Sequence, residues 1–478
     1  MKKDGKCIIC EVIYNKNRGE RTNMLIRVKA ENFKSFDGVT ELSMVSSDKI
    51  ERKPNHSVCV NKVKLLKNAV VYGANASGKT NIIEIFNFIQ LCLRDGLPLE
   101  AVGFFCKNKE SNSGKPSSFE IQFSVGERIF AYGFSAILKS HSIMEEWLYE
   151  LTNGEKCIFE SQKNIMPHLN LADISEGERS RFMTYAEDYT AGSNSLFLAE
   201  LNRNKRYSPK SPLYVFKLVY DWLTNGMKVY RTNEHVSTFE MFYNNQQLQE
   251  LNKLIRTFDT GITDSYISDI SLEELKEKLS PSVYRKILEN IKKLKEHNDF
   301  SDGFSLRSDK DFINVKMNKD DEPAVTVIKL KHENSFYDFE LSEESDGTRH
   351  LFDLIDVLMT STEDVVYIFD ELERSLHPKL TEHFLRLFND KYTGLKVQLI
   401  FTTHEASIMD QALFRHDEIW FVERDAEGSS NLYSLDRFKE KYDRKISKSY
   451  LEGRYGAVPV FKSFDGFSTV EVDENGTI

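Results

Sequence analysis

The chain has 478 residues, of which 40 % are hydrophobic and 29 % are charged, a balance that is ordinary for a soluble protein with a large core. The sequence contains no long apolar run of transmembrane length, and its first residues lack the apolar stretch of a signal peptide, so it predicts a cytoplasmic protein that does not enter a membrane. The net charge of −10 argues against a general nucleic-acid-binding surface, although it leaves room for a local basic groove.

The first 23 residues are interpreted as a tail of uncertain role, because a strand-like alternation begins at Met24. Within this tail, Cys7 and Cys10 are spaced like half of a zinc site. No second pair of cysteines or histidines completes that site, so we expect free thiols in a reducing compartment.

The segment from Met24 to about residue 44 contains two alternating runs that predict a pair of strands. The runs meet at Phe36, Asp37 and Gly38, and an Asp-Gly pair favours a hairpin turn. Further strands are predicted for residues 119–125, 129–137 and 143–151. Gln122 lies within the first of these runs and is interpreted as a structural residue of that strand.

The segment from Val70 to Thr80 predicts a buried strand that leads into a phosphate-binding loop and then a helix. Its spacing is Gly-x4-Gly-Lys-Thr, in which glycines let backbone N–H groups surround phosphate oxygens. Lys79 would reach the β- and γ-phosphates of ATP, and the Thr80 hydroxyl would ligate Mg²⁺. The candidate nucleotide contacts in this loop are Gly73, Asn75, Ser77, Gly78, Lys79 and Thr80.

The middle of the chain, residues 155–311, is predicted to be a mostly helical insertion. Ser271 and Glu274 form a capping-box pattern, and a second helix is predicted from Pro281 to His297. Both helices are too short for a long coiled-coil arm. A basic cluster at residues 202–210 either contacts nucleic acid or is a solvated loop.

A second acidic and polar group of motifs follows the insertion. Val365 to Phe369 predicts a buried parallel strand, and two carboxylates, Asp370 and Glu371, come directly after it. Asp370 would hold the Mg²⁺ shell, and Glu371 would polarise the attacking water. The next predicted strand, residues 397–403, leads into His404, which can hydrogen-bond the γ-phosphate.

The polar turn before this strand predicts a capped helix. Ser345, Gly347 and Thr348 precede an apolar helical run, and a helix N-terminus of this kind can bind an anion.

Together these motifs resemble those of ABC-type ATPases of the RecF, SMC and OLD group. The resemblance begins with Asn-Phe-Lys-Ser-Phe at residues 32–36, continues through the phosphate loop, and extends to Ser-x-Gly-Thr at residues 345–348, which is the form found in OLD-like ATPases. It implies that Lys34 lies beside the nucleotide, although a solvated hairpin lysine fits as well. It also implies that Ser345, Gly347 and Thr348 contact ATP bound by another protomer, and hence a homo-oligomer that contains at least a dimer of heads.

The resemblance implies an α/β, ABC-type head with a mixed sheet and an antiparallel flanking sheet. Residues 24–154 would form its first half, residues 155–311 the mainly helical insertion, and residues 312–478 its second half. The magnesium-sensing glutamine of that fold and the role of residues 450–459 are not assigned.

The implied activity is hydrolysis of ATP with Mg²⁺, with Glu371, His404 and Lys79 as catalytic residues and Thr80 and Asp370 as metal ligands. The chain resembles stand-alone ATPase components of anti-phage systems of the PARIS and Septu types. The segment after His404 lacks the carboxylate cluster of a nuclease domain, so we expect a switch that controls a separate effector, a nuclease. The alternative is a RecF-like repair ATPase that acts directly on DNA, which the acidic charge favours less.

Overall fold

The structure is a computed structural model that describes residues 23–459. Within that range it leaves out residues 51, 191–194, 233, 235–241, 243–244, 298–302, 308–311, 319–321, 361–363 and 439–444. Cys7 and Cys10 lie outside the described residues. No helix in the described part of the chain is long and apolar enough to cross a membrane.

A six-stranded mixed sheet forms the centre of the molecule, in the order β11-β17-β18-β5-β19-β20. Its strands are β11 (Met227–Tyr230), β17 (Val365–Phe369), β18 (Val397–Thr402), β5 (Asn68–Tyr72), β19 (Ile419–Arg424) and β20 (Ser430–Ser434). The first five run parallel, and β20 is antiparallel to β19. Parallel strands bring their carboxyl ends to one edge, where ligands bind in open α/β sheets.

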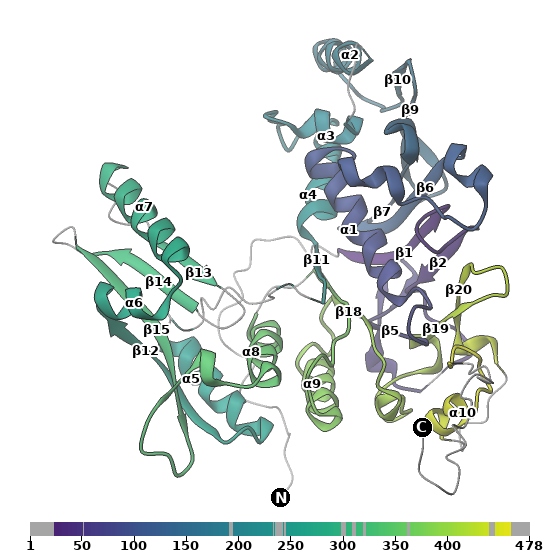
Figure 1. The fold of residues 1–478 in the computed structure, drawn as a ribbon. Helices are drawn as coiled ribbons and strands as arrows, with labels where there is room; N and C mark the ends of the chain where they lie inside the picture. The colour runs from purple at the N-terminus through teal and green to yellow at the C-terminus, as the bar shows by residue number, and fades with distance from the viewer. Residues whose placement is uncertain are drawn as a thin grey trace, which may run out of the picture.

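An antiparallel seven-stranded sheet lies beside this central sheet (Figure 1). Its order is β10 (Ile165–Leu169), β9 (Lys156–Gln162), β8 (Ser142–Glu150), β7 (Arg128–Ile137), β6 (Ser117–Val125), β1 (Met24–Glu31) and β2 (Thr40–Ser43). The strands predicted between residues 24 and 151 are therefore present. The predicted α/β class, with a mixed sheet and an antiparallel flanking sheet, is confirmed.

Helix α1 (Lys79–Asp95) fills the space between the two sheets. Ile82, Ile85 and Phe86 belong to the same buried cluster as inward residues of the antiparallel sheet and as Val366 and Ile400 of the central sheet. Strand β5 is buried on both faces, since Val71 joins this cluster and Val70 joins a second cluster on the opposite side. Such a strand needs an uninterrupted apolar sequence.

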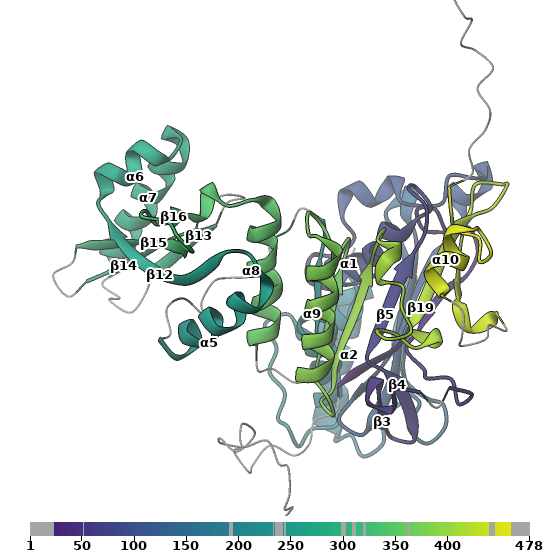
Figure 2. The same ribbon diagram turned by 90° about the horizontal axis from the view of Figure 1, so that it is seen from below.

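The second cluster covers the other face of the central sheet with helices α8 (Asp346–Met359), α9 (Pro378–Lys391) and α10 (Ile446–Leu451). Figure 2 shows α9 running alongside the central strands, with α8 on its outer side. The central sheet therefore lies between α1 on one face and these helices on the other.

Gln398 of β18 joins the two sheets from within the core. Its side-chain oxygen accepts a hydrogen bond from Leu25 N at 2.7 Å, and its Nε2 donates to Leu25 O at 3.0 Å and to Leu66 O at 2.9 Å. Gln398 is fully buried, so these three bonds satisfy an amide that would otherwise be costly in the core.

The insertion contains the predicted helices and, in addition, strands that were not predicted. Its helices are α2 (Glu176–Thr190), α3 (Phe197–Asn202), α4 (Tyr214–Asn225), α5 (Asn245–Ile255), α6 (Leu272–Lys278) and α7 (Pro281–His297). Strands β9 and β10 extend the antiparallel sheet beyond residue 154, and β11 forms an edge of the central sheet. The four residues of β11 are too few to show a period, and their pairing with β17 fixes them as a strand.

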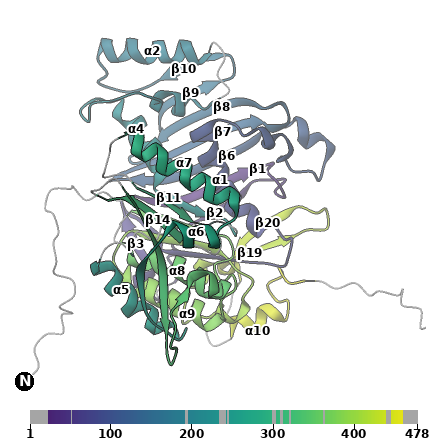
Figure 3. The same ribbon diagram turned by 60° about the vertical axis from the view of Figure 1, so that its left-hand side comes forward.

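A third sheet stands to one side of the head in Figure 1, and it comes to the front of the molecule in Figure 3. It is formed by β12 (Ile262–Ile270), β15 (Pro323–His332), β14 (Phe312–Met317) and β13 (Gly303–Arg307), and the short β16 (Phe339–Glu340) pairs with β15. Helices α6 and α7 pack on it through Leu275, Ile287 and Ile291. Ser271 caps α6 with both bonds of the predicted capping box.

Candidate functional site

The phosphate loop, Gly73 to Thr80, connects β5 to α1 at the carboxyl edge of the central sheet. Gly78 has φ +110°, and a Cβ there would lie 2.5 Å from Ser430 Oγ and 2.7 Å from Ser35 Oγ. A Cβ at Gly73 would lie 2.5 Å from the carbonyl oxygen of Val422. Both positions therefore require glycine, and the backbone can approach a bound group closely.

Two other loop residues differ in their surroundings. The side chain of Asn75 is exposed at the tip of the loop. Ser77 is buried, and its Oγ has no hydrogen-bond partner among the described residues. An orphaned hydroxyl of this kind inside a tight loop is a polar group that a ligand can satisfy.

Lys79 begins α1 and folds back over the loop. Its ammonium donates to Gly73 O at 2.8 Å and to Ala74 O at 3.1 Å. Burial lowers the pKa of Lys79 to about 8, although the nearby carboxylates of Glu371 and Asp370 oppose that shift. The ammonium is thus held inside the loop with backbone carbonyls as its partners, which phosphate oxygens can replace.

Asp370 directly follows β17, and its carboxylate accepts hydrogen bonds from three threonine hydroxyl groups. Its Oδ1 accepts from Thr402 Oγ1 at 2.7 Å and from Thr80 Oγ1 at 3.3 Å, and its Oδ2 accepts from Thr232 Oγ1 at 2.8 Å. Thr80 and Asp370, separated by 290 positions, are therefore in contact as predicted ligands of one ion should be.

The residues present fit Mg²⁺. The described residues hold no cluster of three or more His, Cys, Asp or Glu side chains that could enclose a metal ion. Mg²⁺ is usually bound by one or two protein oxygens together with water and phosphate. The Thr80 hydroxyl and the Asp370 carboxylate are such a pair, and when bound the ion would neutralise charge on the phosphates.

Glu371 and His404 face each other beside Lys79. Nε2 of His404 lies 3.4 Å from Glu371 Oε1, and its Nδ1 lies 3.3 Å from the Lys79 ammonium. Burial, followed by the Lys79 charge, lowers the pKa of His404, whereas Glu371 raises it. Glu371 has φ +56°, and its N–H donates to Thr402 Oγ1 at 2.8 Å. This turn directs Glu371 toward His404 immediately after Asp370.

Three contributors to this site were not predicted. Thr402 and Thr232 fix Asp370, and Glu373 accepts a hydrogen bond from His404 N at 2.6 Å. Burial raises the pKa of Glu373. Two of them could have been found from their positions: Thr402 ends a predicted strand, and Glu373 comes two residues after Glu371. Thr232 could not, because it follows the short strand β11, which no sequence pattern predicts.

Lys34 lies beside α1 rather than at the loop. Its ammonium pairs with Glu84 Oε2 at 3.1 Å and lies 4.9 Å from the centre of the Phe104 ring. Glu84 is one helical turn beyond Thr80. Lys34 thus lies near the start of α1, but its ammonium is paired with a glutamate of that helix.

The predicted signature residues lie at the start of α8. Ser345 is the N-cap, and its Oγ accepts from Thr348 N at 3.1 Å. A side chain at Gly347 would collide with the carbonyl oxygen of Ser375. Within the described chain, no hydrogen bond or ion pair joins these three residues to the phosphate loop. In the described residues they are therefore not bonded to the loop of their own chain.

Gln122 and the motif at residues 450–459, to which the sequence assigned no role at the site, both lie on sheets of the head. Gln122 donates to Glu120 Oε1 at 3.0 Å on the antiparallel sheet. The tail motif packs on the central sheet, where Tyr450 contacts Tyr72 and Phe421, and Tyr433 donates to Tyr455 O at 2.7 Å. Tyr72 precedes Gly73, so this aromatic cluster supports the strand that carries the phosphate loop.

Together the fold and the site define a P-loop ATPase of the AAA or ABC type. The family model described as "AAA domain, putative AbiEii toxin, Type IV TA system" matches residues 69–410, which is more than half of the chain. The protein therefore belongs to this AAA family.

The chain is also similar to two solved structures of SMC heads. The crystal structure of the SmcHead bound to the C-winged helix domain of ScpA is 12 % identical at a TM-score of 0.41, and the match covers 86 % of this chain and 97 % of that chain. The SMC head domain from Thermotoga maritima is 14 % identical at a TM-score of 0.33, with 86 % and 98 % covered. No curated protein matches the sequence.

Proposed function

We propose that this protein binds and hydrolyses ATP with Mg²⁺, and that two copies close on two ATP molecules to switch a separate effector protein, a nuclease, in an anti-phage defence system. One observation carries the ATPase part of the proposal. Lys79, Asp370, Glu371 and His404 come from three different parts of the chain and converge at the carboxyl ends of neighbouring parallel strands.

Each side chain has a role in this proposal. The phosphate loop and the Lys79 ammonium bind the β- and γ-phosphates, and Thr80 with Asp370 would hold Mg²⁺. Glu371 accepts a proton from the attacking water as a general base. His404 donates a hydrogen bond to the γ-phosphate, and Glu373 holds the backbone of His404 in place.

The switch part rests on the lack of a hydrogen bond or ion pair between the signature and the loop in the described residues. Ser345, Gly347 and Thr348 form a helix N-terminus that is not bonded to the loop of the same chain. The proposal assigns them to ATP bound by a second copy, so that ATP binding closes the pair and hydrolysis opens it. The family description, which names a putative toxin of a Type IV TA system, supports a role alongside a second protein.

The basic cluster gives no support to direct DNA binding. Within this cluster, the Lys205 ammonium lies 4.3 Å from the centre of the Tyr185 ring and Arg203 pairs with Glu200 at 3.1 Å, whereas Arg206 and Lys210 are exposed. Two of its four cations therefore interact with the α2–α4 region, and the other two face solvent, as in a solvated loop. We therefore prefer the switch function to that of a repair ATPase that acts directly on DNA.

The Glu371→Gln variant tests the proposal. Removing a general base lowers turnover by about 10²-fold or more while the phosphate loop still binds ATP. We expect this variant to form an ATP-dependent dimer by light scattering and to retain an effector that copurifies from cells. Lys79→Ala, which loses the phosphate contact, is the control that should do neither. Unchanged turnover would remove Glu371 from the mechanism, and copurified DNA without a protein partner would overturn the switch.

A further inference from the structure

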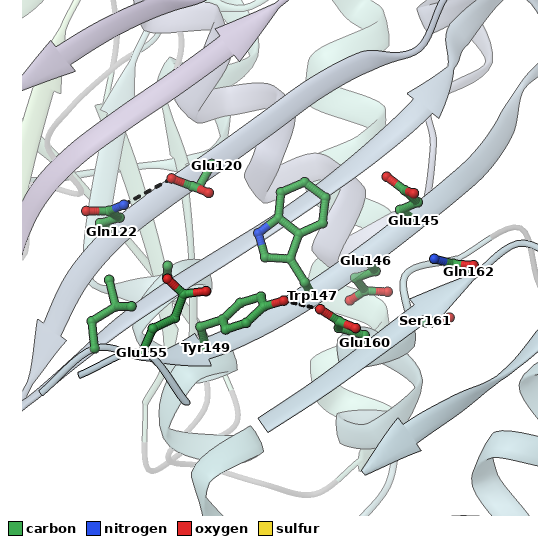
Figure 4. Close-up of a pocket in the computed structure, with 12 residues that line it drawn as sticks. Glu120, Gln122, Glu145, Glu146, Trp147, Tyr149, Glu155, Glu160, Ser161 and Gln162 are labelled. Atoms are coloured by element: carbon green, nitrogen blue, oxygen red, sulfur yellow. Dashed lines mark hydrogen bonds between the residues drawn. The ribbon is translucent and has the colours of Figure 1, made fainter. Parts of the chain in front are cut away.

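A pocket of about 430 Å³ lies on the antiparallel sheet, formed by side chains of β6 to β9 and the turn between β8 and β9. Its size is within the range of ligand sites. Trp147 and Tyr149 occupy its centre, and glutamate and glutamine side chains surround them (Figure 4). None of these residues belongs to the ATP site.

Aromatic side chains form the floor of the pocket, and a glycine on the neighbouring strand leaves room for one of them. Trp147 is only partly buried, and a Cβ at Gly133 on the neighbouring strand β7 would collide with the indole ring. Glycine at this position therefore lets the indole lie close to the sheet backbone. Tyr149 follows on the same face of β8, because alternate residues of a strand point to the same side.

The surrounding charge is negative. Five of the twelve lining residues are glutamates and none is a lysine or an arginine. The carboxylate of Glu146 is bonded on the inner side of the sheet, where Phe197 N and Leu198 N donate to it. The other glutamates are Glu120, Glu145, Glu155 and Glu160.

Little of this outer charge is neutralised nearby. Glu120 pairs with Lys29 at 3.2 Å, and Lys29 is shared with Glu41. Glu160 accepts from the Tyr149 hydroxyl, which is a neutral partner. Glu145 and Glu155 are exposed to solvent. The pocket thus keeps an excess of negative charge around an aromatic surface.

This chemistry selects one kind of occupant. These glutamates do not form a cluster that could enclose a metal ion in the described chain. Phosphate-bearing ligands would be repelled. A guanidinium or ammonium group on a flexible stem can stack on the indole face and pair with carboxylates at the same time, and arginine does both best.

We propose that this pocket, the Trp147 pocket, binds an arginine- or lysine-bearing segment of a partner polypeptide. The site lies on the flanking sheet, outside the ATP site, and the inference does not depend on hydrolysis. If the switch function also holds, the pocket provides the head with a surface on which a basic partner segment can dock.

A titration with a synthetic peptide tests the proposal. The probe is an acetylated octapeptide of alternating glycine and arginine, and its match carries citrulline at each arginine, which removes the charge but keeps the shape. The chain has three tryptophans, and Trp222 and Trp420 are buried, so the fluorescence change reports mainly on Trp147. We expect saturable binding of the arginine peptide by fluorescence and calorimetry, and none of the citrulline peptide.

Variants of the full chain then locate the binding. Replacing Glu145, Glu155 and Glu160 by Gln should weaken binding about tenfold or more, because each lost carboxylate removes part of the attraction. The matched control replaces three exposed glutamates elsewhere by Gln, which changes the net charge equally and should leave affinity unchanged. These control positions are Glu176, Glu187 and Glu289.

Trp147→Phe gives a second, independent readout. It should abolish the fluorescence response and reduce the calorimetric affinity several-fold, since phenylalanine is a weaker cation–π partner. The absence of saturable binding would overturn the proposal. So would equal loss of affinity in both triple variants, or preference for spermidine over the peptide. ATP turnover measured alongside separates this result from the proposed function, because the triple variants leave the ATP site intact.

Discussion

At the scale of single residues, Lys79 links ATP binding to pH. Burial lowers its pKa to about 8 in the free protein. Phosphate groups favour the charged ammonium, so ATP binding should raise this pKa and take up protons near pH 8, and affinity should fall as the pH rises above 8. Calorimetry in two buffers with different ionisation enthalpies measures the uptake.

The matched variant for this prediction is Lys79→Arg. A guanidinium stays charged throughout this pH range, so proton uptake should disappear even if some affinity is lost. Proton uptake that persists in Lys79→Arg would assign the effect to another group, such as His404, whose pKa burial also lowers.

Glu373 is expected to act through His404 rather than on the substrate. Glu373→Ala removes the acceptor for His404 N, so we expect kcat to fall about tenfold or more with little change in KM. Glu373→Gln keeps an acceptor oxygen and should retain most of the activity. Steady-state kinetics of both variants measure this, and equal losses would show that the charge of Glu373, rather than the bond, is what matters.

At the scale of elements, the start of α6 offers a test that leaves the ATP site untouched. Ser271 Oγ accepts from Glu274 N at 3.1 Å, and Glu274 returns a bond to Ser271 N at 2.8 Å. Ser271→Ala should lower the free energy of unfolding of the third-sheet region by about 1 kcal/mol. Hydrogen exchange of α6 and α7 measures this, and ATP turnover should not change.

Strong local patterns allowed most elements of the head to be predicted. The run Val365 to Phe369 is apolar throughout, and it forms a strand buried on both faces. The loop from Gly73 to Thr80 has fixed glycine spacing, and the structure gives both glycines a steric reason. The third sheet was missed because strands such as β12 carry mixed polar residues on exposed positions, which weakens the alternation.

The limits of prediction at the site have a similar cause. Asp370 and Thr80 were placed together because each follows its own motif, and the structure brings them into contact. Thr232 reaches Asp370 only because β11 pairs with β17, a long-range contact that no local pattern records. The pairing of Lys34 with Glu84 likewise depends on how the hairpin packs on α1.

At the scale of the whole molecule, a mixing experiment tests whether ATP sites are shared between copies. If each site takes its loop from one chain and its signature from another, a dimer of Lys79→Ala with Gly347→Trp has one site with both defects and one intact site. Random mixing at equal amounts should then restore about a quarter of wild-type turnover. Each variant alone should be inactive, and no recovery on mixing would place both motifs in one chain's site.

The contacts of Gln398 bear on how the protein is made. The ribosome delivers Leu25 and β5 early, yet their partners β18 and β19 are synthesised more than 300 residues later. Until then β5 is an apolar strand without its neighbours, and such a segment is prone to aggregation. The antiparallel sheet and the insertion are synthesised in full before β18, so they are available to fold before the central sheet is complete. Nascent chains stalled before β18 should depend on chaperones, and those stalled after β19 should not.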